Sequence, residues 1–310
     1  MKRLATAATL AAIVAAGCSV AQADDHGFKT KIVDGPSTQT ARLDLSTPEG
    51  AVMAQRKLSC STIDGQDVVY HWEGRAYSRR MGERDKHIFD VEGMNVRSCT
   101  SVTDPERGPG FKLVSREILL YLDKDTGEPM RQWENPWTGD TVEVLHVAND
   151  PVNFGDHVVG RDGKPAKTSI RVDGDKYIQT TTVPLFYPNP LGGDFQAEVG
   201  GTYHATEMFN TMGDLESLLS ADTTTADAYV GWVRMSDWLP WMKMGGRDGV
   251  IYFHTAGSKI GGIEDLSDRM RQEIKTTYPD YTTAPPDDAP RRNMTSWKDY
   301  KRIMEARKAE

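Results

Sequence analysis

Between about residue 58 and residue 255 the chain alternates short β-rich runs with closely spaced turn signals. Glycine and aspartate favour tight turns, and runs at this spacing are typical of antiparallel sheets rather than of alternating strands and helices. The sequence therefore predicts a mainly β fold, either an antiparallel β-barrel or a strongly curled sheet. Turns are expected at Asp64-Gly65, Asp125-Thr126-Gly127, Thr138-Gly139, Asp162-Gly163 and Asp173-Gly174.

Helical signals lie mainly near the two ends of this β-rich region. Thr47 followed by Pro48 is a typical helix start, which predicts a short helix to about Lys57. After Gly262 the apolar residues recur at helical spacing, so helices are expected over residues 263–277 and 296–308. The expected outline is therefore lipocalin-like, with peripheral α-helices near the N- and C-termini.

The first 23 residues have the features of a secretory signal peptide. Lys2 and Arg3 precede an apolar stretch, and Ala21-Gln22-Ala23 offers a small-residue cleavage site. The mature chain is therefore expected to be exported, either periplasmic or secreted, without a transmembrane segment. One alternative stays open: Ala15-Ala16-Gly17-Cys18 also resembles a lipoprotein box, in which Cys18 would carry a lipid anchor and place the protein at the outer membrane.

Beyond the signal peptide the sequence predicts a flexible leader over residues 24–43 and one β-rich domain over residues 44–310, because no linker or internal repeat divides it. Cleavage changes the net charge from −8 to −10, since it removes Lys2 and Arg3 and no acidic residue. Such an acidic chain is not expected to bind nucleic acid. Cys60 and Cys99 would then form either one disulfide or two buried thiols.

Four ionisable residues interrupt apolar stripes on expected strands. Side chains two residues apart share a strand face, which places His146 in line with Val142 and Val144 in Thr141–Ala148. The same parity holds for Glu207 in Gly201–Asn210, for Arg234 in Ala228–Ser236 and for His254 in Val250–His254.

These four residues are the candidate catalytic groups. Because buried charges are costly unless they are paired or face water, we expect them to converge on one interior pocket. The alternative is structural: Glu207 and Arg234 would form an ion pair, and each histidine would bond to the backbone within the core.

Aromatic and amide residues near these stripes are the candidate ligand contacts. Tryptophan suits flat apolar ligands, although it is equally common as core filler. The candidates are Tyr70, Trp72, Trp133, Trp137, Asn149, Asp150, Tyr203, Trp232, Trp238 and Tyr252.

Several reaction types have no support in the sequence. It contains no serine nucleophile elbow, no phosphate-binding glycine loop, no dinucleotide fingerprint and no zinc-protease motif. Neither a metal nor an organic cofactor is therefore expected. The residue types that remain permit acid–base catalysis by His146, Glu207 or His254, with Arg234 holding an anion.

Distinctive stretches run in order along nearly the whole mature chain. The longest is REILLYLDKDTGEPMRQWENPWTGDTVEVLHVANDPVN, and others are YHWEGRAY, YPNPL, YHATEMF, GWVRMSDWLPWMKMGGRDG and NMTSWKDYK. With these stretches the chain resembles the family known as domain of unknown function 1838. The resemblance implies no reaction, but His146, Glu207 and Arg234 all lie within its motifs.

The leading hypothesis from the sequence is an exported protein that binds an apolar, aromatic or terpenoid-like small molecule in an interior pocket. It would act as a cofactor-independent lyase or isomerase. The alternatives are a non-catalytic periplasmic carrier with the same pocket and a structural envelope protein with no small ligand.

Overall fold

The computed structural model describes residues 41–161, 164–191, 200–288 and 296–309. All of them belong to one compact unit, Ser37–Glu310. The expected signal peptide, the lipidation site at Cys18, most of the leader and the turn at Asp162-Gly163 lie outside the described residues.

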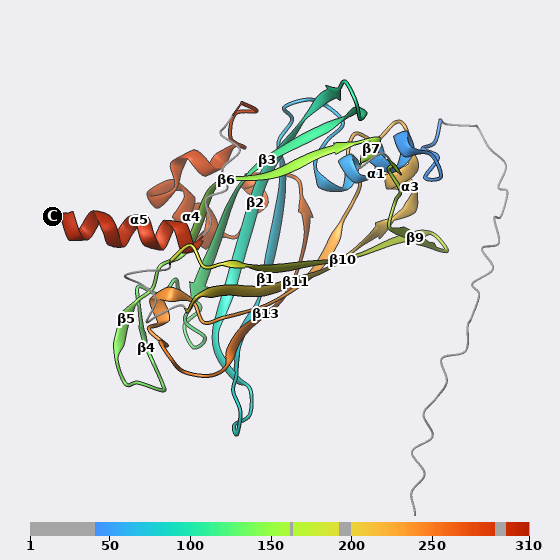
Figure 1. Cartoon of the computed structure of the whole chain (residues 1–310). Helices are drawn as coiled ribbons and strands as arrows, with labels where there is room; N and C mark the ends of the chain where they lie inside the picture. The colour runs from blue at the N-terminus through green and yellow to red at the C-terminus, as the bar shows by residue number, and fades with distance from the viewer. Residues whose placement is uncertain (1–40, 162–163, 192–199, 289–295, 310) are drawn as a thin grey trace, which may run out of the picture. The chain divides into compact units, whose positions relative to one another are not determined.

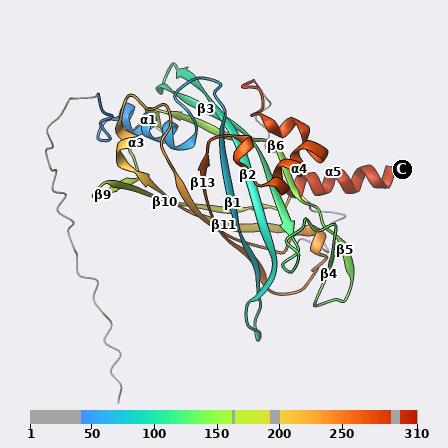
Figure 2. The same cartoon turned by 180° about the vertical axis from the view of Figure 1, so that it is seen from behind.

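One nine-stranded antiparallel sheet organises the fold (Figures 1 and 2). The hydrogen-bonded order is β6-β3-β2-β1-β13-β12-β11-β10-β9. The mainly β, antiparallel prediction is therefore confirmed, but the described strands do not close into a barrel, because β6 and β9 remain the two edges. The strands are β1 (Val68–Arg79), β2 (Lys86–Asp104), β3 (Gly108–Leu122), β6 (Val147–Val158), β9 (Ile170–Asp173), β10 (Lys176–Pro188), β11 (Thr202–Asp214), β12 (Tyr229–Ser236) and β13 (Val250–Ile260).

Two short hairpins accompany the sheet. One pairs β4 (Gln132–Glu134) with β5 (Thr141–Glu143), and the other pairs β7 (Gly160–Arg161) with β8 (Lys164–Pro165). The first contains the NPWTG turn, in which the Asn135 side chain accepts the backbone N–H of Trp137 at 2.9 Å and donates to the carbonyl of Met242 at 2.9 Å. Asn135 thus fixes both the turn and its attachment to the short helix η2 (Pro240–Met242).

Alternation along the strands gives the large sheet two distinct faces. In β13, Ile251, Phe253 and Thr255 are buried, whereas His254 between them is exposed. We call the face that carries Phe253, Trp72 and Trp232 the tryptophan face. We call the opposite face the α4 face, because α4 (Asp268–Thr277) packs on it against Met94 and Ile118.

Helices lie at both ends of the tryptophan face (Figures 1 and 2). At one end α5 (Ser296–Ala309) brings Trp297 within 5.0 Å of the Tyr203 ring, measured between centroids. At the other end lie α1 (Pro48–Ser59) and α3 (Leu215–Leu219), where Lys57 Nζ donates to the carbonyl of Leu218 at 2.9 Å. The Cys60–Cys99 disulfide fastens the end of α1 to β2.

The helix predictions are mostly confirmed. Thr47 caps α1 by accepting the N–H of Gly50 at 3.0 Å, and residues 296–309 form the last helix. The helix expected over residues 263–277 is divided into a short 3-10 turn, η3 (Ile263–Asp265), and α4, because Ser267 caps a new start by accepting the N–H of Met270 at 3.0 Å. A further 3-10 turn, η4 (Pro279–Thr282), follows α4.

Within the described part of the chain, no helix combines the length and the apolar character needed to cross a bilayer.

Candidate functional site

Glu117 is a carboxyl group on the tryptophan face. It lies on β3 with Leu119 and Tyr121 on the same side, and it pairs in register with Asn95 of β2 and Asn149 of β6. The Asn149 side chain is close enough to help lower the pKa of Glu117. The side chain keeps part of its surface accessible to water.

The surroundings of Glu117 disfavour its charged form. Burial, and to a lesser extent the nearby charge of Glu207, raise its pKa to about 7, while Arg234, Arg97 and the Asn149 side chain act in the opposite direction. A carboxyl group with this pKa exchanges its proton near neutral pH, which is what a general acid or base requires.

An ion pair lies on the same face. Arg234 of β12 and Glu207 of β11 occupy directly opposed positions, and their side chains pair there. Arg234 also donates to the hydroxyl of Tyr203. Burial lowers the pKa of Arg234, but Glu207 and Tyr203 raise it by more, so the guanidinium stays charged. The side chains of Arg234 and Glu207 are 18% and 21% exposed, so a small molecule can reach them.

Aromatic rings on the tryptophan face lie close together. Trp72 of β1 lies 6.3 Å from Trp232 of β12 between ring centroids, and Trp232 stacks on Phe253 at 5.9 Å. Trp72 needs glycine beside it, because a Cβ at Gly93 would lie 2.2 Å from its indole. Both tryptophans are partly exposed, as expected for a surface that can contact a flat apolar ligand.

The structure does not place His146 with this group. The strand expected over Thr141–Ala148 is interrupted at residues 144–146, so the expectation that His146 shares a strand face with Val142 and Val144 is wrong. The interruption has a local cause: the His146 Nδ1 accepts the backbone N–H of Tyr121 at 3.1 Å, and the ring stacks on Tyr121 at 5.8 Å.

His146 instead lines a pocket of about 460 Å³, which also involves Tyr278, Tyr281 and Ile303. Ala148 of the edge strand β6 is another lining residue, and Ile303 belongs to α5, so the pocket lies along the β6 edge of the sheet. Burial, and to a lesser extent the positive charge of Arg131, lower the pKa of His146 to about 4. The ring is therefore neutral at physiological pH.

His254 also turns away from the tryptophan face. It is exposed between the buried residues Phe253 and Thr255. Tyr252 shares its orientation, stacking on Tyr77 at 5.1 Å and donating to Asp85 at 2.9 Å. The expected convergence of four ionisable residues is thus wrong for His254, while Glu207 and Arg234 do meet. His146 contacts the tryptophan face through the ring of Tyr121.

The remaining candidate contacts fall into several places. Trp133, Trp137 and Trp238 form an aromatic cluster with Trp241 at the α5 end. Tyr70 lies on the tryptophan face and donates its hydroxyl to the carbonyl of Leu58. Asn149 contacts Glu117 and Tyr203 contacts Arg234, whereas Asp150 pairs with Arg116 at 2.9 Å on the α4 face.

Sequence reasoning missed Glu117 and Arg97. The signal was present, because the alternation in Ser115–Leu122 places Glu117 in line with Leu119 and Tyr121. The same parity rule that singled out Glu207 would have found it.

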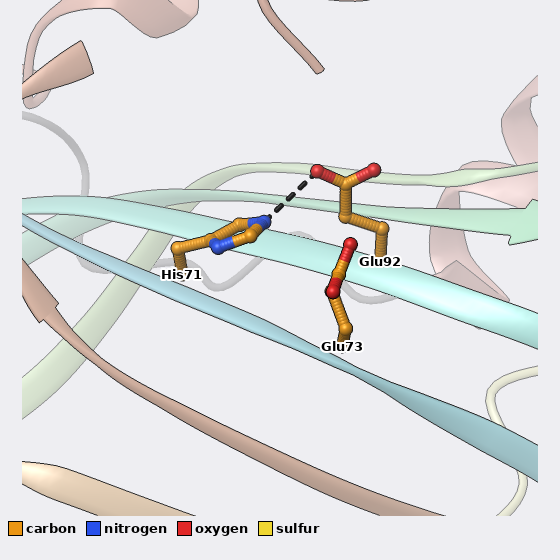
Figure 3. A group of neighbouring side chains, drawn as sticks. All are labelled: His71, Glu73 and Glu92. Carbon is orange, nitrogen blue, oxygen red and sulfur yellow. Dashed lines mark hydrogen bonds and ion pairs between the residues drawn. The ribbon is translucent and has the colours of Figure 1, made fainter. Parts of the chain in front are cut away.

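A second group of ionisable side chains lies across β1 and β2 (Figure 3). His71, Glu73 and Glu92 offer ligand atoms within 4.8 Å of one another. Glu92 is fully buried and accepts hydrogen bonds from His71 Nε2 at 2.9 Å, from Ser267 and from Arg269 Nε at 2.7 Å.

This group is better suited to fastening α4 than to holding a metal. Burial alone would raise the pKa of Glu92, but its three donors lower it below its ordinary value. Because the Arg269 guanidinium already supplies the positive charge, a cation would have to displace it. We therefore interpret the group as the attachment of α4 to the sheet.

One comparison with known proteins is informative. A family model described as "Protein of unknown function (DUF1838)" matches residues 65–304, a range that includes every residue of the tryptophan face discussed above. Curated proteins and solved structures gave no match.

Proposed function

The chain belongs to the family described as protein of unknown function DUF1838, and from this premise we propose that it binds an apolar or aromatic small molecule on the tryptophan face and transfers a proton at Glu117. The reaction class is that of a lyase or isomerase without an organic cofactor. A carboxyl group with a pKa near 7 beside the Arg234–Glu207 pair is the observation that carries the proposal.

Each member of the group has a chemical task. Glu117 gives or takes the proton, since its pKa lies close to the working pH. Arg234 stabilises negative charge that develops on the substrate, and Glu207 and Tyr203 hold the guanidinium in place. Trp72 and Trp232 contact the apolar part of the molecule.

The proposal includes a concave tryptophan face that forms a half-open hollow. Glu117 on β3 and Glu207 on β11 are five strand spacings apart in the sheet order. In a flat sheet that would be about 24 Å, beyond the range at which one charge strongly affects another in salt. The influence of Glu207 on the pKa of Glu117 therefore supports a curled sheet.

Export remains part of the proposal. The Cys60–Cys99 disulfide supports it, because disulfides persist in oxidising compartments such as the periplasm and the extracellular space. The signal-peptide pattern in residues 1–23 supports it independently.

Proton exchange into a defined ligand tests the proposed function. The purified protein would be incubated in D2O with aromatic ketones that carry acidic α-hydrogens, such as acetophenone and 2-tetralone, and proton NMR would follow deuterium uptake. We expect the wild type to accelerate exchange and the Glu117→Gln variant to bind the ketone without exchange. Glu106→Gln is the matched control, because Glu106 is exposed in the turn between β2 and β3.

Other outcomes would favour the alternatives. If the wild type binds these ketones but returns them unaltered, the protein is a carrier rather than an enzyme. If native mass spectrometry and the ketone titrations both detect no small ligand, the structural envelope protein is the better account. Exchange that persists in Glu117→Gln would remove Glu117 from the mechanism.

A further inference from the structure

We infer that the small molecule bound on the tryptophan face carries a carboxylate and that Arg97 holds it. This inference rests on the proposed function, because it names the substrate class of the same site. It depends on a guanidinium that faces the site and has no carboxylate partner among the residues that the structure describes.

Arg97 lies on the tryptophan face. On β2 it pairs in register with Ser115 of β3, which shares its side of the sheet with Glu117 two residues further on. Its Nε donates to the side-chain oxygen of Asn95 at 2.6 Å. Within the described ranges, neither Nη1 nor Nη2 of Arg97 has a hydrogen-bond partner, and no carboxylate forms an ion pair with it.

Other shielded arginines of the domain are neutralised by a carboxylate. Arg234 pairs with Glu207, Arg116 with Asp150 at 2.9 Å, and Arg56 with Asp64 at 2.6 Å. Removing a charge from water is costly unless an opposite charge compensates it. Burial accordingly lowers the pKa of Arg97. Among the described residues, the lack of a carboxylate partner therefore distinguishes Arg97 from these other shielded arginines.

A second cation lies close to Arg97. The guanidinium carbon of Arg97 is 4.7 Å from the centroid of the Tyr70 ring, and Lys259 Nζ is 5.6 Å from the same centroid. Lys259 is held by the carbonyl of Lys57 at 2.8 Å and by Thr225 and Ala226 at 2.7 Å. Burial, together with the charge of Arg97, lowers the pKa of Lys259 to about 7, so Lys259 adds only part of a positive charge at neutral pH. Its hydrogen bonds hold it in place, which leaves Arg97 as the group free to bind.

The chemistry of the guanidinium selects the ligand class. Its planar N–H groups match the two oxygens of a carboxylate, and a bidentate pair of this kind is stronger than a neutral hydrogen bond. Glu117 lies close enough to affect Arg97 electrostatically but does not pair with it. A carboxylate on Arg97 would supply the missing negative charge and would place its α-carbon toward Glu117.

The apolar part of the ligand also has a defined position. Trp72 follows Tyr70 by two residues on β1 and lies on the same face, about 7 Å further along the strand. A molecule with its carboxylate on Arg97 and a ring on Trp72 spans that distance. The ligand class that fits is an aryl-substituted acetic acid or a similar small aromatic acid.

A matched pair of probes tests the inference. 1-Naphthylacetate and 1-naphthylacetamide differ in charge but hardly in shape, and calorimetry at pH 7 would measure both dissociation constants. We expect the wild type to bind the acid about tenfold or more tightly than the amide, the difference typical of charged hydrogen bonds. Arg97→Gln should remove that preference and leave amide binding unchanged.

Control variants separate charge from folding. Arg75→Gln removes an exposed arginine that pairs with Asp90 at 3.8 Å, and should leave both dissociation constants unchanged. Arg97→Lys keeps the charge but loses the planar fork, so it should recover only part of the acid preference. If Arg97→Gln does not fold, the two dissociation constants of the wild type still test whether the site prefers a carboxylate to an amide.

Two results would overturn the inference: equal affinity of the wild type for acid and amide, including no detectable binding of either, or unchanged acid affinity in Arg97→Gln. Proton transfer at Glu117 is tested by a different result from carboxylate binding at Arg97. Glu117→Gln should still bind the acid, so a variant that binds and also still exchanges α-hydrogens would refute proton transfer at Glu117 while leaving Arg97 as the carboxylate site.

Discussion

Glu117 on β3 and Asn149 on β6 lie directly opposite each other on the tryptophan face of the sheet, and the Asn149 side chain helps to lower the pKa of Glu117. Their chain neighbours Arg116 and Asp150 form an ion pair on the α4 face. The β3–β6 register shifts between Ser115 and Glu117, an irregularity of the kind that often redirects side chains near functional sites. Adjacent residues thus serve both the candidate site and the attachment of the outer helices.

Arg234→Met should destabilise the fold by about 2–4 kcal/mol, because it leaves the Glu207 carboxylate shielded from water without its partner. Glu207→Gln together with Arg234→Met should cost less than the two single changes added together, since no unpaired charge remains. Urea denaturation of the four proteins measures this coupling. Additive effects would show that the pair contributes no mutual stabilisation.

Glu92→Gln should destabilise the domain by about 2–4 kcal/mol at pH 7, because Arg269 and His71 lose a fully buried acceptor. The pKa of Glu92 is lowered in the folded state, so its contribution is present above the unfolded value and is lost as the pH falls. The difference between wild type and variant should therefore shrink in acid.

The same cluster yields a metal prediction. Neither a chelator nor added zinc should change the Tm of the wild type, because Arg269 already neutralises Glu92. Glu73→Gln is the control for Glu92→Gln, since Glu73 is 59% exposed and its loss should alter stability by about 0.5 kcal/mol or less. A zinc-dependent rise in Tm that disappears in Glu92→Gln would contradict this interpretation.

His146→Gln should change the acid stability of the fold. The pKa of His146 is lowered to about 4, so between that value and the unfolded value the unfolded chain binds more protons. Stability should therefore fall as the pH drops below about 6.5, by up to about 3 kcal/mol from this group. The variant should lack this part of the pH dependence in denaturation curves recorded from pH 7 to pH 4. Identical curves would refute the lowered pKa.

Reducing the disulfide should weaken the attachment of α1. Cys60 and Cys99 are 39 residues apart in sequence, and closing a loop of that length stabilises a fold by about 4 kcal/mol in the chain-entropy treatment. Cys60→Ala with Cys99→Ala should lower the free energy of unfolding by an amount of that order. A double variant as stable as the oxidised wild type would show that the bridge adds nothing.

The sequence predicted the strands better than it predicted the site. Turn residues and alternation are local signals, so the antiparallel sheet, the Thr47 cap and the shared face of Glu207 and Arg234 followed from them. His146 failed for a physical reason: its ring replaces a backbone acceptor for Tyr121 and ends the strand. No periodicity within residues 141–148 records that partner, which lies on another strand.

Glu117 and Arg97 illustrate a second limit. Parity alone could have placed Glu117 on the tryptophan face, but its raised pKa depends first on burial and then on Glu207. Glu207 lies 90 positions later in the chain and five strands away in the sheet order. For Arg97, sequence shows neither its position over the Tyr70 ring nor the absence of an ion-paired carboxylate among the described residues. Both properties arise only when distant strands are brought together.

The titration of Glu117 tests the central claim most directly. Carbon-13 NMR of the side-chain carboxyl group, assigned by comparison with Glu117→Gln, would follow its protonation from pH 4 to pH 9. We expect a midpoint of about 7. We also expect the wild type to lose stability as the pH rises from about 4.5 to above 7, a loss that Glu117→Gln does not share. A midpoint at the ordinary glutamate value of about 4.3 would contradict a proton-transfer role for Glu117.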